Sequence, residues 1–142
     1  MSETLKKLYE YNSNNPGSVG WRLKKHCAVI DKHLNIDEKV LFAFTGQKNE
    51  MFYELFNTCV VVLTDRRIIV AQKRVVWGYF LKSITAEMFN DLSVYQGLIW
   101  GKVKIDTVKE EVVISNISKL GLDDIETNIT NVMGCQQHNK TC

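Results

Sequence analysis

The sequence predicts an α+β fold in which about seven antiparallel strands form one β-sandwich or partly open barrel. Three observations predict it. The single proline, Pro16, lies in a cluster of turn-forming residues near the N-terminus. Short runs rich in β-branched and aromatic residues fill 37–117, and helical spacing of apolar residues returns near residue 122. The expected parts are an N-terminal helical extension over 1–35, a sheet-built domain over 36–133 and a flexible tail over 134–142.

Two short helices are expected before the sheet. The first opens at Ser2, a residue suited to the N-cap, and carries Leu5, Leu8 and Tyr9 at helical spacing. The second begins at Ser18 and runs to about residue 34. It is amphipathic, because basic side chains lie mostly off its apolar face. That face consists of Leu23, Cys27, Ile30 and Leu34.

The strands follow as short apolar runs separated by turns. Lys102–Thr107 alternates strictly, with Val103 and Ile105 on one face, which is typical of a half-buried antiparallel strand. A closing helix is predicted from apolar residues at helical spacing, with acidic residues in its first turn. The expected strands are 40–45, 59–63, 68–70, 77–85, 92–95, 102–107 and 111–115, and the helix residues are Leu122, Ile125, Ile129 and Val132.

Composition and charge exclude several classes of protein. The net charge is only +2, and the excess lies in residues 1–36, where six Lys/Arg face three Asp/Glu. This is far weaker than the basic face that double-stranded nucleic acid needs, so no nucleic-acid partner is expected. The N-terminus does not read as a secretory signal, and no apolar run approaches a membrane span. With four cysteines, the expected location is the reducing cytoplasm.

The order of elements and three segments resemble bacterial pleckstrin-homology-like domains of the YokE-like group. The segments are Ile36–Val40, Val62–Val70 with its Thr-Asp-Arg-Arg turn, and Gly97–Thr107. The resemblance covers about residues 36–133. It implies a pleckstrin-homology-like sandwich closed by a C-terminal helix, and a recognition role whose ligand the fold does not fix, since this superfold serves phosphoinositide binding, peptide binding and protein docking.

Two local expectations concern residues of these segments, which we call the sequence signature. Asp65 is expected to hydrogen-bond the backbone of its own tight turn. Gly97 and Gly101 are expected to relieve steric strain where the chain reverses or bulges.

An apolar segment before the second strand is the first candidate binding surface. Its side chains cannot all face inward from one strand, because alternate side chains point to opposite faces. Three interpretations stay open: packing beneath the N-terminal helices, a docking surface for a partner protein, or a loop that contacts a membrane. The candidate partner-binding residues are Met51, Phe52, Tyr53, Leu55 and Phe56.

Basic residues form the second candidate surface, which would contact an anionic partner or membrane. The alternative is that they are solvated charges on a helix face and on sheet edges. The loop 46–57 offers Lys48 against Glu50 and Glu54, which is a poor site for a phosphoinositide head group. The candidate residues are Arg22, Lys24, Lys25, Lys32, Lys73 and Arg74.

No catalytic or metal-binding motif is found, so neither an enzyme nor a cofactor is expected. His26 and His33 are interpreted as surface residues. Cys135, His138 and Cys142 do not complete a tetrahedral metal site. The sequence thus predicts a non-catalytic module for protein–protein interaction, as a docking, inhibitor or self-associating scaffold protein. The alternative is peripheral binding to anionic lipid through the apolar loop and the basic helix.

Overall fold

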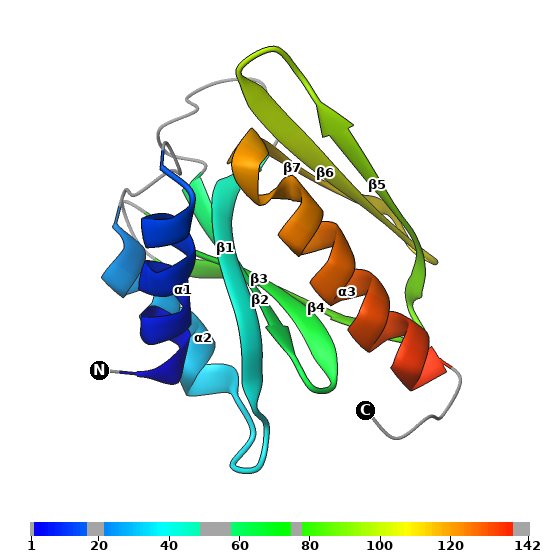
Figure 1. Ribbon diagram of the computed structural model, residues 1–142. Helices are drawn as coiled ribbons and strands as arrows, with labels where there is room; N and C mark the ends of the chain where they lie inside the picture. The colour runs from blue at the N-terminus through cyan, green and yellow to red at the C-terminus, as the bar shows by residue number, and fades with distance from the viewer. Residues whose placement is uncertain (1, 17–21, 49–57, 75–77, 138–142) are drawn as a thin grey trace.

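The computed structural model describes residues 2–16, 22–48, 58–74 and 78–137 (Figure 1). Its strands form one seven-stranded antiparallel sheet in the order β4-β3-β2-β1-β7-β6-β5. The fold class predicted from the sequence is confirmed. The elements are α1 (Glu3–Asn14), α2 (Leu23–His33), β1 (Val40–Lys48), β2 (Thr58–Thr64), β3 (Arg67–Lys73), β4 (Tyr79–Thr85), β5 (Phe89–Gln96), β6 (Trp100–Thr107), β7 (Glu111–Ser118), the 3₁₀ turn η2 (Lys119–Gly121) and α3 (Leu122–Gln137).

The sheet bends where β1 passes from one half to the other. β1 pairs with β2 over Val40–Gln47 but with β7 only at Gln47 and Lys48. Gly46 lies at this crossing, and a Cβ atom there would lie 2.3 Å from the Ile114 Cγ2 atom. A glycine is therefore needed for β1 to approach β7 this closely. β4 and β5 are the two edges, so the sheet stays open.

Two hydrophobic cores lie on opposite faces of the sheet. The larger one fills the space between the inner face and α3, and includes Phe44, Ile105 and Ile125. The second lies between the outer face of β1–β3 and the two N-terminal helices, and includes Leu8 and Ile30. The N-terminal helices thus pack directly on the domain (Figure 1).

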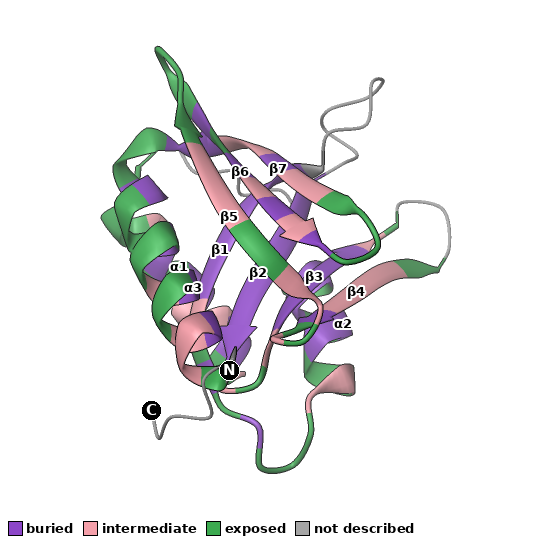
Figure 2. Ribbon diagram, turned by 90° about the vertical axis from the view of Figure 1, so that its right-hand side faces the viewer, coloured by how far each residue is buried: buried purple, intermediate pink, exposed green. Residues whose placement is uncertain are grey.

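The two cores explain the hydrophobic patterns of the strands. All seven residues of β2 are buried, because helices cover one face and the inner core covers the other. β6 alternates between buried and more exposed residues, because only its inner face is covered. Figure 2 shows the same contrast between the two halves of the sheet: β2 is purple throughout, whereas β5 is pink and green. The continuous apolar run Cys59–Leu63 is therefore a strand buried on both faces.

Several predicted boundaries are corrected by the structure, because β1, β3 and β7 each end three residues later than predicted and other elements also differ. α2 begins at Leu23, after Arg22 in a left-handed conformation, whereas Ser18 lies outside the described residues. α3 continues through the predicted boundary at residue 133 to Gln137. β5 begins at Phe89, three residues earlier than predicted, since Phe89 still pairs with Thr107. No helix in the described ranges is long and apolar enough to cross a bilayer.

Candidate functional site

A cavity of about 280 Å³ lies between α2 and the adjoining ends of β3 and β4. Four of its lining residues are Lys or Arg, a fifth is His, and none of the described lining residues is acidic. We call this surface the basic groove. Its lining residues are Arg22, Lys25, Ala28, Val29, Lys32, His33, Lys73 and Tyr79.

Helical periodicity places the cations of α2 in the groove. Lys25, Val29 and Lys32 recur at steps of four and three, so they share one face of the helix. The neighbouring face carries Leu23 and Ile30, which are buried against the sheet. Burial of that face sets the rotation of α2, and the rotation directs the lysines toward the edge of the sheet.

His26 connects α2 to the end of β3 by a hydrogen bond. Its Nδ1 atom accepts a hydrogen bond from the backbone N–H of Lys73 at 2.8 Å, which brings Lys73 beside the helix. The expectation that His26 is a surface residue is wrong, because its side chain is fully buried. The spacing of Leu23, His26, Cys27 and Ile30 carries this information, since these four residues share one helical stripe.

His33 orients Tyr79 at the other side of the groove. The His33 Nδ1 atom lies 2.7 Å from the Val29 carbonyl oxygen, which only accepts hydrogen bonds, so Nδ1 carries a proton. In the neutral ring, Nε2 then accepts from the Tyr79 hydroxyl at 3.2 Å. The two rings lie 5.2 Å apart between centroids. Tyr79, half exposed, is thus held as an aromatic wall.

The groove combines positive charge with an apolar floor. Ala28, Val29 and the Tyr79 ring supply apolar surface, and the four cations surround it. Such a surface attracts anionic groups by charge and holds an apolar neighbour of those groups by contact.

Four of the six predicted anion-contacting residues meet in the groove: Arg22, Lys25, Lys32 and Lys73. Lys24 lies beside it, in a shallower cavity that it shares with Arg22 and Lys25. Arg74 is exposed and outside the lining, where its backbone N–H donates to the Gly78 carbonyl at 3.2 Å. The predicted partner-binding residues Met51, Phe52, Tyr53, Leu55 and Phe56 lie outside the described residues.

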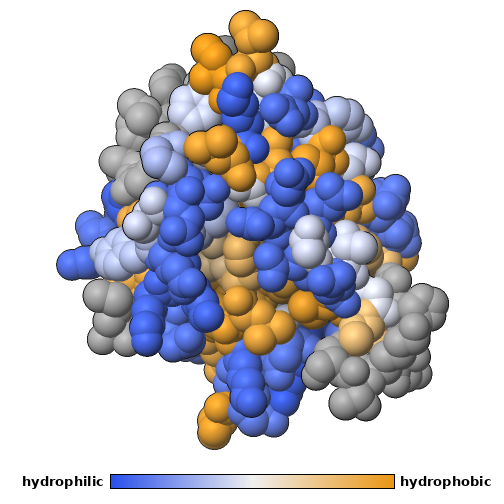
Figure 3. Space-filling view, viewed as in Figure 1, coloured by the Kyte–Doolittle hydropathy of each residue, from blue (hydrophilic) through white to orange (hydrophobic). Residues whose placement is uncertain are grey.

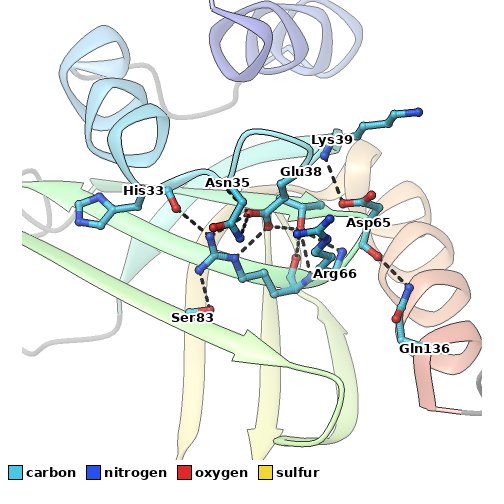
Figure 4. A network of polar contacts seen from close by, with 10 residues as sticks. His33, Asn35, Glu38, Lys39, Asp65, Arg66, Ser83 and Gln136 are labelled. Atoms are coloured by element: carbon cyan, nitrogen blue, oxygen red, sulfur yellow. Dashed lines mark hydrogen bonds and ion pairs between the residues drawn. The ribbon is translucent and has the colours of Figure 1, made fainter.

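The residues of the sequence signature form a polar network behind the groove (Figure 4). The buried Glu38 carboxylate accepts from Arg67 Nε and Nη2, both at 2.9 Å. Thr64 Oγ1 donates to Glu38 Oε2 at 2.7 Å. The Arg67 guanidinium also donates to the His33 carbonyl at 2.8 Å and to the Ser83 hydroxyl at 3.2 Å. Arg67 therefore joins the end of α2 to β1, β3 and β4.

Burial alone would raise the pKa of Glu38. Hydrogen bonds from Arg67, Thr64 and the Asn35 backbone, together with the Arg67 charge, outweigh burial and lower this pKa to about 2. The carboxylate is thus ionised and saturated with donors, which leaves it no capacity for a ligand. The signature residues are structural, and they fix the position of the helix that carries the basic groove.

Thr64, and not Asp65, stabilises the turn between β2 and β3. Its Oγ1 atom accepts from the backbone N–H groups of Arg66 and Arg67 at 3.1 and 3.0 Å. The expectation for Asp65 is wrong, because its carboxylate accepts from the Lys39 backbone N–H at 3.2 Å and ties this turn to the start of β1. A threonine hydroxyl is equally able to close such a turn, so the residue type alone did not decide between them.

Metal and thiol chemistry have no support in the described ranges. No cluster of three or more His, Cys, Asp or Glu side chains there could hold a metal ion. Burial and, to a smaller extent, the Asp31 charge raise the pKa of the Cys27 thiol to about 12. Cys27 is therefore a protonated core residue and a poor nucleophile.

A second exposed surface was missed by the sequence analysis. Leu98, Ile99 and Trp100 form the turn between β5 and β6, and Leu120 follows in η2. Leu98 is 92% exposed, Ile99 67% and Leu120 65%. We call these four residues the hairpin tip. The signal for it was present as three consecutive apolar residues between two glycines, Gly97 and Gly101.

The two glycines act differently. The Gly97 N–H donates to the Trp100 carbonyl at 2.9 Å and closes the turn, as expected for a chain reversal. Gly101 lies where the register of β6 against β7 shifts, as expected for a bulge. It also provides space for packing, because a Cβ atom there would lie 2.4 Å from the Leu122 Cδ1 atom. Gly101 thus lets the start of α3 contact β6.

Comparison with known proteins agrees with the fold described above. The sequence model of the family described as Bacterial PH domain matches residues 34–130. No curated protein matches the chain.

Two solved structures are similar in fold. A DUF1696 family protein with a pleckstrin-homology domain from Shewanella loihica has a TM-score of 0.53 at 13% identity, covering 75% of this chain and 92% of its own. A pleckstrin homology domain from Shewanella amazonensis has a TM-score of 0.52 at 16% identity, covering 75% and 94%. At these identities the likeness concerns the fold alone.

Proposed function

Because the chain belongs to the bacterial PH domain family, whose domains are generally non-catalytic binding modules, we propose that it docks another protein. Within the family we assign it to the YokE-like group on the segments 36–40, 62–70 and 97–107. We place it in the cytoplasm, because the buried Cys27 is a free thiol, as is usual in a reducing compartment.

The observation that supports docking is the presence of four cations, Arg22, Lys25, Lys32 and Lys73, along one apolar floor. The partner that fits this surface is an acidic segment of a protein, in which Asp or Glu alternates with apolar residues. The carboxylates would pair with the cations, and the apolar side chains would contact Val29 and Tyr79.

The spacing of the cations favours a peptide over a single lipid head group. Arg22 and Lys32 are ten residues apart on α2, which corresponds to about 15 Å along the helix axis. An extended segment of about five residues spans this distance. A phosphoinositide head group would instead need several cations converging on one small pocket. Met51, Phe52, Tyr53, Leu55 and Phe56 belong to the proposal as additional apolar contacts, on their sequence alone.

The proposal is tested with a fluorescent twelve-residue peptide of alternating glutamate and leucine. We expect anisotropy titrations to give saturable binding to the wild-type protein. The Lys25→Glu/Lys32→Glu variant should bind at least about tenfold more weakly, which corresponds to a loss of about 1.4 kcal/mol. Raising the salt concentration should weaken the wild-type complex, because these charges are exposed.

A matched control keeps the change in net charge constant. Lys6 and Lys109 are exposed and lie on α1 and in the β6–β7 turn, and neither lines the basic groove. Lys6→Glu/Lys109→Glu should bind the peptide like the wild type. If both variants lose binding equally, the attraction is one of net charge, and the groove is not the docking site.

Binding to anionic lipid through the basic helix is the alternative outcome. Vesicles of phosphatidylcholine and phosphatidylglycerol that compete fully with the peptide, and lose binding in Lys25→Glu/Lys32→Glu, would favour this second function. The two outcomes are thus separated by one pair of variants and two probes.

A further inference from the structure

We propose that the hairpin tip, Leu98, Ile99, Trp100 and Leu120, inserts into the interface of a lipid bilayer that carries anionic lipids. This contact goes beyond docking at the basic groove and uses other residues. It would hold the module at a membrane while the groove stays available to a protein.

The tip is apolar and almost fully solvated. Leu98 and Ile99 occupy the turn itself, at 92% and 67% exposure. Trp100 opens β6 and is 43% exposed. In Figure 3, apolar side chains gather at the top of the molecule, over the β5–β6 hairpin. Exposure of a group of apolar side chains to water does not stabilise a folded protein. Such a patch is typical of an interaction site.

Two lysines lie directly behind the apolar side chains. The Lys119 Nζ atom donates to the Leu98 carbonyl at 3.3 Å, so its charge sits at the base of the turn. The Lys102 Nζ atom lies 5.2 Å from the centre of the Tyr95 ring, one pair of residues along the hairpin. Leucine and isoleucine lie in front, tryptophan and tyrosine beside them, and lysines behind. This order matches the acyl, interfacial and phosphate layers of a bilayer, counted from its interior outward.

The shape of the tip favours a bilayer over a protein partner. A stable protein interface covers about 800 Å² on each partner with 20–30 residues. The tip has three apolar residues at the vertex of the β5–β6 hairpin (Figure 1) and a fourth in the adjoining η2, which is a small and narrow surface. Such a surface penetrates a fluid interface more readily than it fills a complementary protein pocket.

The acidic residues nearest in sequence are Asp123 and Asp124, in the first turn of α3. Asp124 lines a different cavity, together with Tyr11 and Asn128, between α1, β1 and α3. The hairpin and the adjoining η2 instead hold the cations Lys102 and Lys119, which suit anionic lipid.

The test is co-sedimentation of the full chain with vesicles of phosphatidylcholine alone or with one quarter phosphatidylglycerol. The wild type should bind the anionic vesicles. Leu98→Asp/Ile99→Asp should lower the partition coefficient at least tenfold, and Lys102→Gln/Lys119→Gln several-fold on anionic vesicles only. All these side chains are exposed, so the thermal unfolding midpoint should not change.

The matched control is Ile36→Asp/Val108→Asp, which introduces the same charges at two exposed apolar residues away from the tip. This variant should bind vesicles within about twofold to threefold of the wild type, since only remote charge changes. Equal binding by wild type and tip variant would overturn the proposal, and so would the absence of wild-type binding.

Two further outcomes would give the lipid a different site or the tip a different role. If Lys25→Glu/Lys32→Glu abolishes vesicle binding and the tip variant keeps it, the lipid belongs to the basic groove. If sedimentation velocity shows self-association that the tip variant loses, without vesicle binding, the tip is a contact between copies of the chain. Either result overturns the membrane proposal, and the peptide titration tests the groove separately.

Discussion

Strands β2 and β3 are covered on both faces, whereas β5 and β6 have one face open to solvent. In the first half, α1 and α2 cover the outer face, and every residue of β2 is buried. In the second half, β6 alternates and β5 holds no fully buried residue. The same antiparallel sheet therefore supports two surfaces of different kinds.

The difference in coverage explains where each candidate surface arises. The basic groove exists because α2 packs on the outer face beside β3 and brings its cations to the end of that strand. The hairpin tip exists because no helix covers the outer face of β5 and β6. We expect stability to depend on the first half and substitutions to be tolerated better in the second.

The largest effect is expected from Arg67→Ala. This change leaves the Glu38 carboxylate buried without its cation and releases the end of α2. Loss of one partner of a buried pair costs about 3–5 kcal/mol, which urea unfolding at neutral pH would measure. Arg66→Ala is the control, because its Asp37 partner is exposed, and it should barely move the midpoint. Equal effects of the two variants would contradict a structural role for the network.

The same network predicts a pH dependence. The pKa of Glu38 is lowered to about 2 in the folded protein, from an ordinary value of 4.5. Its contribution is therefore complete above pH 4.5 and is lost as the pH falls toward 2. We expect the stability difference between wild type and Glu38→Gln, about 2–3 kcal/mol at pH 7, to shrink over this range. A difference independent of pH would indicate a packing role only.

A matched pair of valines compares the two halves directly. Val62 in β2 is fully buried under the N-terminal helices, whereas Val113 in β7 pairs with Lys104 and is only half-buried. Val62→Ala should lower the free energy of unfolding by about 2 kcal/mol, because it deletes methyl groups that folding buries. Val113→Ala should lower it by less than about 1 kcal/mol, because that side chain is only half-buried. Chemical denaturation of both variants would reveal whether the halves differ as described.

The sheet could be predicted from the sequence because strand and turn signals are local. All seven predicted strands were found, and Val103 and Ile105 lie on the buried face as their alternation indicated. The boundaries of α2 and α3 were less accurate, since Gly134 does not end its helix. Packing of the N-terminal helices on the sheet was one interpretation that the sequence left open. The strands that they cover could not be predicted, because a run buried on both faces has the same pattern whatever covers it.

The groove was predictable only in part. The spacing of Lys25 and Lys32 places them on one helical face, and this is visible in the sequence. Their meeting with Lys73 and Tyr79 depends on the hydrogen bond from Lys73 to His26 and on how α2 packs. These are tertiary contacts between segments more than forty residues apart, which no local pattern encodes. Predicting the exposed tip needed the same kind of knowledge, namely that none of the described helices covers the outer face of β5.

The central claim is that the basic groove binds a partner and contributes little to folding. The most direct measurement is a paired one on Lys25→Glu/Lys32→Glu: its urea unfolding midpoint and its affinity for the glutamate–leucine peptide. We predict an unfolding midpoint equal to that of the wild type and an affinity at least about tenfold lower. Unchanged affinity, or a loss of affinity matched by Lys6→Glu/Lys109→Glu, would contradict the account.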